Sequence, residues 1–71
     1  MNNISEGFIR RRDKEFSQFL RYAAASNAEV RSCFYIAKGR KYLSHDEAEN
    51  DIERTNRIGR RIRRLDDSLE A

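Results

Sequence analysis

The chain has 71 residues, of which 38% are hydrophobic and 38% are charged, and its net charge at pH 7 is +3. This length and apolar fraction allow one small domain with about one hydrophobic stripe per helix. No apolar run is long enough to cross a membrane, no secretory signal is visible, and a single cysteine excludes an intrachain disulfide framework, so we expect a cytoplasmic protein with no membrane segment. The absence of proline favours long helices.

The N-terminal segment predicts a short helix over residues 3–11. Gly7 and the arginine run at 10–12 weaken this helix, and Asp13 is a favourable N-cap for a new one. We therefore expect the first long helix to begin after Asp13.

Residues 14–38 have the apolar spacing of a helix face. This face is wide enough to contact more than one neighbouring helix. Asn27 falls in its middle, where a buried amide needs a hydrogen-bond partner and would fix the register of packing. Gly39 is the expected left-handed residue after the helix. The apolar positions of the face are Phe16, Phe19, Leu20, Ala23, Val30, Phe34 and Ala37.

Residues 45–69 predict a second long helix. Ser44 and Glu47 have the spacing of a capping box at its start. Its apolar residues follow a nearly strict 4-3 repeat, which is typical of helical bundles. Each long helix has about 25 residues and is thus about 37 Å long, and the short connection predicts an antiparallel hairpin. The repeat consists of Ala48, Ile52, Thr55, Ile58 or Gly59, Ile62, Leu65 and Leu69.

Catalytic chemistry finds little support in this sequence. His45 is the only histidine and falls at the first turn of a predicted helix, where a solvated surface position is expected. Cys33 lies at the edge of the apolar stripe and is expected to be a buried, inert thiol. The acids of residues 46–53 occupy different sides of a helix, so we expect neither a metal site nor a cofactor.

The basic residues carry the main functional signal. Residues 54–64 contain six arginines and no acid, whereas residues 44–53 contain five acids and no lysine or arginine. An arginine strip opposite the apolar seam has the chemistry to pair with a phosphate backbone. A solvated polar face with local pairs such as Glu53–Arg57 is the alternative. The candidate nucleic-acid-binding residues are Arg10, Arg11, Arg12, Lys14, Arg54, Arg57, Arg60, Arg61 and Arg64, with Arg63 beside them.

Several short motifs resemble the four-helix bundle protein family, which includes 23S ribosomal RNA intervening-sequence proteins and the accessory variability proteins of retroelements. Each motif is weak alone, but their order and spacing together are specific. The motifs are Asn3-Ile4-Ser5-Glu6-Gly7, Lys14-Glu15-Phe16, Phe19-Leu20, Glu29, Ile36-Ala37, Tyr42-Leu43-Ser44 and Ile58-Gly59-Arg60.

The resemblance implies an all-α fold: an antiparallel hairpin of two long helices plus a short N-terminal helix, as part of an up-down four-helix bundle. It also implies that the chain, which starts at Met1, lacks the family's first helix and the front of its second, so that the bundle is a truncated one. Such members assemble into rings of five, and the retroelement members associate with nucleic acid through a basic surface.

We therefore treat residues 1–71 as one partial bundle domain. The leading hypothesis is a non-enzymatic homo-oligomer, a pentamer by the resemblance, that binds RNA or DNA backbone. The alternative is a structural or protein-interaction module without a nucleic-acid role, either a truncated gene product or a chain whose missing helices a protein partner supplies. The predicted core or oligomer contacts are Phe16, Phe19, Leu20, Val30, Phe34, Ile52, Ile58, Ile62, Leu65 and Leu69.

Overall fold

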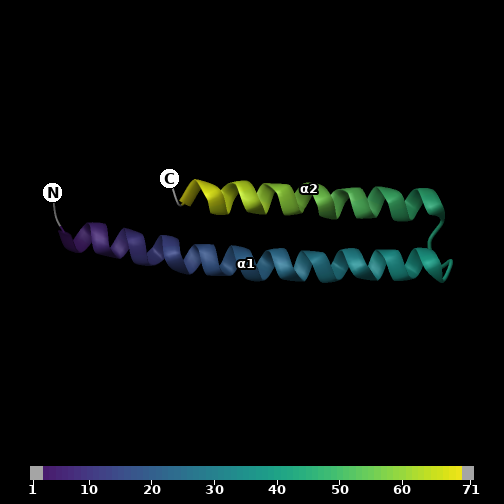
Figure 1. Ribbon diagram of the computed structural model, residues 1–71, viewed down its shortest axis with the longest axis horizontal. Coiled ribbons are helices and arrows are strands. Elements are labelled where there is room, and N and C mark those ends of the chain that lie inside the picture. The colour runs from purple at the N-terminus through teal and green to yellow at the C-terminus, as the bar shows by residue number, and fades with distance from the viewer. Residues whose placement is uncertain (1–2, 70–71) are drawn as a thin grey trace.

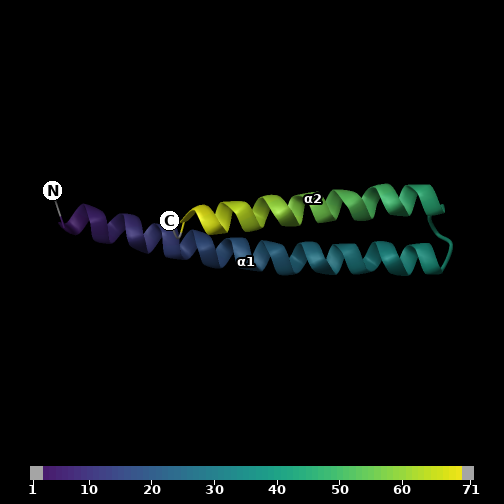
Figure 2. The ribbon, with the colours of Figure 1, turned by 45° about the horizontal axis from the view of Figure 1, so that its top comes forward.

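The computed structural model describes residues 3–69 as two helices joined by a tight turn (Figure 1). Helix α1 spans Asn3–Gly39 and helix α2 spans His45–Leu69, and the described residues contain no strand. The two helices run antiparallel, side by side, in both views (Figures 1 and 2). The all-α class and the helical hairpin predicted from the sequence are confirmed, while residues 3–69 form two helices and not a four-helix bundle.

Helix α1 is continuous through the segment where the sequence predicted a break. The prediction of a separate helix over residues 3–11 is therefore wrong, and Asp13 lies inside α1 instead of capping it. The physical reason is that Gly7 costs a helix only about 1 kcal/mol, while arginine is among the better helix formers. Without a proline, nothing at residues 10–13 stops the ladder of backbone hydrogen bonds.

The end of α1 is closed by Lys41, not by Gly39. Lys41 has a φ of 62°, and its N–H donates to the carbonyl oxygen of Lys38 at 3.1 Å. The N–H of Tyr42 donates to the carbonyl oxygen of Ala37 at 2.9 Å. These two bonds are those of a Schellman motif in which Lys41 is the left-handed residue. Gly39 belongs to the last turn of α1, so its predicted role as the left-handed residue is wrong.

The start of α2 is the one predicted. The backbone N–H of Glu47 donates to Ser44 Oγ at 3.1 Å, and the N–H of Ala48 donates to the Ser44 carbonyl oxygen at 3.0 Å. Ser44 is thus the N-cap, and Asp46 and Glu47 lie in the first turn, where the helix dipole favours acids.

The core between the helices is narrow. Leu20 of α1 and Ala48, Ile52 and Thr55 of α2 are the buried residues of the described chain. Of the other predicted core residues, Phe34, Ile62 and Leu69 are half-buried, whereas Ile58 is 49% exposed because Gly59, the alternative at that step of the repeat, lies nearer α1. The remaining predicted contacts are exposed in the single chain and stay predictions as oligomer contacts: Phe16, Phe19, Val30 and Leu65.

Helix α1 has 37 residues and α2 has 25, so the N-terminal part of α1 extends beyond the end of α2 (Figure 2). We call this end of the hairpin the open end. The opposite end, at residues 40–44, is the turn end.

Candidate nucleic-acid interface

The arginine face of α2, which we define as Arg57, Arg60, Arg61 and Arg64, is exposed along its length. The predicted pair between Glu53 and Arg57 is not formed, because Glu53 Oε1 instead accepts from Arg60 Nη2 at 3.3 Å, about two turns along α2. Within residues 5–69, the ion pairs involve none of the other three arginines of this face.

Arg54 lies beside the arginine face, one turn closer to the turn end. Its Nη1 atom is 4.0 Å from Asp51 Oδ1, and its side chain is 77% exposed. An ion pair this long and this exposed contributes little to stability. Arg54 therefore remains accessible to an external anion.

The structure divides the predicted N-terminal basic cluster between different sides of α1. Arg11 Nε lies 3.5 Å from Glu15 Oε1, and the guanidinium of Arg12 lies over the ring of Phe8, 5.6 Å from its centroid. Arg10 and Lys14 instead line a hollow beside α2. Consecutive residues of a helix are about 100° apart around its axis, so a run of arginines cannot form one contact surface.

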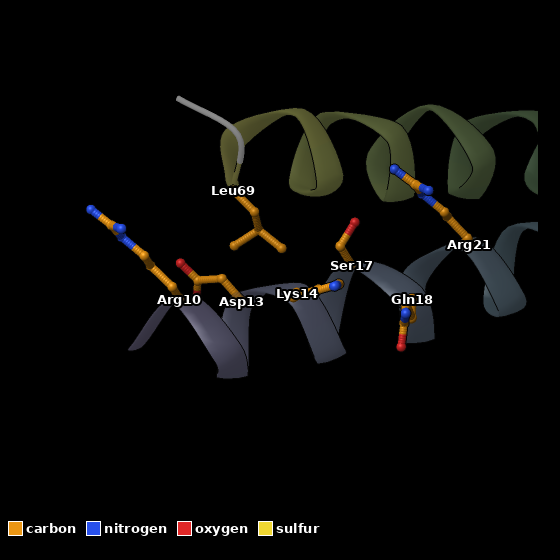
Figure 3. A pocket seen from close by; sticks show the side chains of 7 residues that line it. All are labelled: Arg10, Asp13, Lys14, Ser17, Gln18, Arg21 and Leu69. Atoms are coloured by element: carbon orange, nitrogen blue, oxygen red, sulfur yellow. The ribbon is translucent and has the colours of Figure 1, made fainter. Parts of the chain in front are cut away.

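The hollow at the open end has a volume of about 370 Å³ and lies where Leu69 of α2 reaches α1 (Figure 3). In Figure 3 the side chains of Ser17 and Arg21 extend toward α2, and Gln18 points away from it. Its complete lining is Arg10, Asp13, Lys14, Ser17, Gln18, Arg21 and Leu69.

Arg21 is a basic residue of this hollow that sequence reasoning missed. Its Nε atom is 3.6 Å from Asp66 Oδ2, and the Ser17 hydroxyl donates to the other oxygen of the same carboxylate. The spacing of Arg10, Lys14 and Arg21, at four and then seven residues, places them on one side of α1 and was the signal available in the sequence. Asp66 neutralises part of the positive charge of Arg10, Lys14 and Arg21, so the hollow is less cationic than the arginine face.

Both basic regions lie in the open half of the hairpin. Antiparallel packing brings residues 57–64 of α2 beside the middle of α1, since Arg21 contacts Asp66 and Asn27 contacts Thr55. The acids of residues 46–53 lie toward the turn end, where Lys38 Nζ and Glu49 Oε1 form an ion pair of 2.6 Å. The molecule is thus basic at one end and acidic on α2 near the other.

The residues considered for catalysis are both on the surface. His45 is exposed at the first turn of α2, as predicted. Cys33 is exposed as well, so the predicted buried thiol is wrong. The position of Cys33 is at the outer edge of the α1 stripe, which a single neighbouring helix does not reach.

The described residues contain no group of three or more His, Cys, Asp or Glu side chains placed to hold a metal ion. In the same part of the chain, neither helix is long and apolar enough to cross a membrane.

The model of the family described as 23S rRNA-intervening sequence protein matches residues 1–64. The chain belongs to this family. The match covers all of α1, the turn and α2 as far as Arg64, so the whole hairpin up to the end of the arginine face falls within it.

The resemblance drawn from the short motifs is thereby confirmed at the level of the 23S rRNA-intervening sequence family. Comparisons with curated proteins and with solved structures gave no match.

Proposed function

We propose that this 23S rRNA-intervening sequence family member is a non-enzymatic helical protein that self-associates and binds the backbone of nucleic acid through its arginine face. The observation that carries the proposal is the state of Arg57, Arg61 and Arg64. They are exposed, and no ion pair within residues 5–69 engages them.

Arginine suits phosphate because its planar guanidinium group donates two parallel hydrogen bonds to phosphate oxygens. Arg57, Arg61 and Arg64 are spaced by four and three residues, so they form a row on one side of α2. No aromatic residue is interleaved with them, which favours contact with the backbone over stacking on bases. The description of the family refers to 23S rRNA, so RNA is the first ligand to test.

Self-association has separate support. Large apolar side chains are exposed on both helices, among them Phe16 and Phe19, whose rings are stacked at a centroid distance of 6.5 Å. Apolar surface of this extent on a small protein marks a contact site. A ring of five, as the family resemblance implies, and closure by another protein remain proposals about the form of that contact.

The test is fluorescence anisotropy of a labelled short RNA duplex, and of a DNA duplex, titrated with the protein at about 25 and 150 mM KCl. We expect binding that weakens steeply with salt. The variant Arg57→Gln/Arg64→Gln should bind at least tenfold more weakly at low salt and lower the salt slope by up to about 2. The control Arg40→Gln/Lys41→Gln removes the same charge at the turn end and should bind nearly as well as the wild type.

Equal loss in both double variants would mean that net charge, not the arginine face, attracts the nucleic acid. An absence of binding at about 25 mM KCl would contradict the proposal. That result would favour the alternative of a structural module, for which the local pairs Arg60–Glu53 and Arg11–Glu15 and the exposed apolar surface already give some support.

A further inference from the structure

Helix α2 carries a polar stripe beside its seam with α1. Each residue of the stripe follows a seam residue by one position, as Glu49 follows Ala48 and Arg63 follows Ile62. The stripe changes sign along the helix, from acids near the turn end to arginines in the open half, and we call Arg60 and Arg63 the α2 group. In chain order the stripe is Glu49, Glu53, Asn56, Arg60, Arg63 and Asp67.

Helix α1 carries a corresponding stripe that includes the hollow at the open end. Arg10, Lys14 and Arg21 line this hollow, and Arg21 follows the buried Leu20 by one position. In an antiparallel pair of right-handed helices, positions that follow the seam on both helices lie on the same side of the pair. The two stripes therefore lie side by side on one polar side of the hairpin. We call the exposed Arg10 and Lys14 the α1 group.

The two groups of cations are separated along the hairpin. Asp66 is level with Arg21, because their side chains form an ion pair of 3.6 Å. At 1.5 Å per residue, the α2 group is centred about 7 Å from this pair toward the turn end, and the α1 group about 14 Å from it in the opposite direction. The groups are thus roughly 20 Å apart. Between them Asp66 balances Arg21, and Asp67 is exposed.

We infer that this polar side binds a nucleic-acid duplex across one groove, with the α2 group on the backbone of one strand and the α1 group on the backbone of the other. This inference rests on the nucleic-acid binding proposed above, and it specifies the class of nucleic acid and a second contact surface. The wide groove is the minor groove in A-form RNA and the major groove, about 12 Å wide, in B-form DNA. With the phosphate groups included, the backbones that flank such a groove lie roughly 18 Å apart, close to the spacing of the two groups.

The gap between the two groups favours a duplex over a single strand. A groove has no phosphates along its floor, so Asp66 and Asp67 face no like charge when the two backbones lie on either side of them. A single strand that reached both groups would place phosphates over these acids. Neither stripe has an aromatic residue between the groups, so unpaired bases find no stacking surface there.

The acids near the turn end restrict the duplex to the open half. Glu49 and Glu53 continue the α2 stripe beyond the α2 group, and their charge repels phosphate. The 3.3 Å pair between Arg60 and Glu53 joins side chains that are 62% and 52% exposed, so it contributes little and Arg60 can exchange Glu53 for a phosphate. In the other direction α1 extends beyond α2 and presents the α1 group past the end of that helix (Figure 2).

The test is fluorescence anisotropy with a labelled duplex of about 12 base pairs, enough for one helical turn, and with its single strand, at several salt concentrations from about 25 mM KCl. The variant Arg10→Gln/Lys14→Gln removes the α1 group. We expect it to raise the Kd for the duplex at least about fivefold and to lower the salt slope by about 1–2, while the Kd for the single strand changes less than about twofold. RNA and DNA duplexes are titrated separately, and the tighter wild-type binding identifies which of the two the groups fit.

The matched control is Arg11→Gln/Arg12→Gln. It removes the same charge from the same turn of α1 on its other sides, where Arg11 pairs with Glu15 and Arg12 lies over the ring of Phe8. This control should leave the Kd for the duplex within about twofold of the wild type, since neither arginine belongs to the α1 group. Equal loss in the two variants, or equal loss for duplex and single strand, overturns the inference.

These outcomes separate the inference from the proposed function. If Arg57→Gln/Arg64→Gln weakens binding while Arg10→Gln/Lys14→Gln has no effect, the arginine face binds the backbone and the inference alone is wrong. If the wild type binds neither duplex nor single strand at low salt, the proposed function fails and the inference with it. Circular dichroism of each variant checks that a loss of binding is not a loss of helix, and all of the substituted residues are exposed.

Discussion

The side-chain nitrogen Nδ2 of Asn27 donates a hydrogen bond of 2.8 Å to the backbone carbonyl oxygen of Thr55, across the middle of the hairpin. The same threonine is contacted by Arg31, whose Nε donates to Thr55 Oγ1 at 3.0 Å. The threonine hydroxyl in turn donates to the carbonyl oxygen of Ile52 at 2.6 Å. This polar network satisfies the amide that the sequence placed in an apolar stripe, and it ties one turn of α1 to one turn of α2.

The first prediction concerns this bond. Asn27→Ala should lower the free energy of unfolding by about 1 kcal/mol, because a part-buried hydrogen bond is lost and Thr55 is buried. The measurement is urea denaturation followed by circular dichroism at one fixed protein concentration, since self-association changes apparent stability. Asn50→Ala, at an exposed position of α2, is the control and should change stability by less than about 0.5 kcal/mol.

The second prediction concerns the glycine opposite this network. A Cβ atom on Gly59 would lie 3.4 Å from both Arg31 Nη2 and Asn27 Nδ2, which is ordinary contact. Gly59→Ala should therefore be tolerated and gain up to about 1 kcal/mol of helix propensity. Gly59→Leu should cost about 1–3 kcal/mol, because a larger side chain displaces both donors from Thr55.

Thermal melts of the two Gly59 variants, with Gly7→Ala as a reference, separate the effect of helix propensity from the effect of packing between the helices. Gly7 has open space around its Cβ position, so its alanine variant reports propensity alone. If Gly59→Leu melts as high as Gly59→Ala, close approach at Gly59 is not required and the packing argument is wrong.

The sequence predicted the parts of this fold that depend on periodicity and capping. The 4-3 repeat of α2 correctly predicted that Ala48, Ile52 and Thr55 face α1 and are buried. Ser44 correctly predicted where that helix starts. The same reasoning failed at Asp13 because a good N-cap residue does not interrupt a helix whose backbone bonds are otherwise continuous. Helix formation is cooperative, so a local N-cap signal at Asp13 is not enough to end a helix that is stable on both sides of it.

The candidate site was less predictable than the fold. The arginine face followed from α2 spacing, but the partner of Glu53 did not, because Arg57 and Arg60 are both within reach of it along the helix. Arg21 was missed since its role depends on Asp66, which lies 45 positions later in the chain. Contacts across an antiparallel pair require the register, and the sequence alone does not fix it.

The third prediction concerns the turn. Lys41 adopts a φ of 62°, a conformation that costs a residue with a Cβ about 1 kcal/mol more than it costs glycine. Lys41→Gly should therefore raise the free energy of unfolding by about 0.5–1 kcal/mol, although the greater freedom of glycine in the unfolded chain offsets part of the gain. Arg40→Gly, in the preceding position, should instead lower it. Chemical denaturation of both variants provides the measurement, and the opposite order of stabilities would rule out Lys41 as the left-handed residue.

The last prediction concerns pH. The hydrogen bond from Lys38 and the charge of its ammonium group hold the pKa of Glu49 below its ordinary value. In the unfolded chain this carboxyl group has a pKa of about 4.3, so the unfolded chain takes up the proton first as the pH falls. The contribution of Glu49 to stability is therefore complete above that pH and is lost as the pH falls through the lowered pKa of the folded state.

Glu49→Gln should thus reduce the drop in melting temperature between about pH 5 and pH 3. The reduction should be a few degrees at most, because the pair is on the surface. Glu29→Gln removes an exposed carboxylate of α1 that belongs to none of the ion pairs within residues 5–69, and it should leave the pH dependence near that of the wild type. Melting curves at half-unit pH intervals test this. A Glu49→Gln curve parallel to the wild type would show that the 2.6 Å pair with Lys38 contributes nothing to stability in solution.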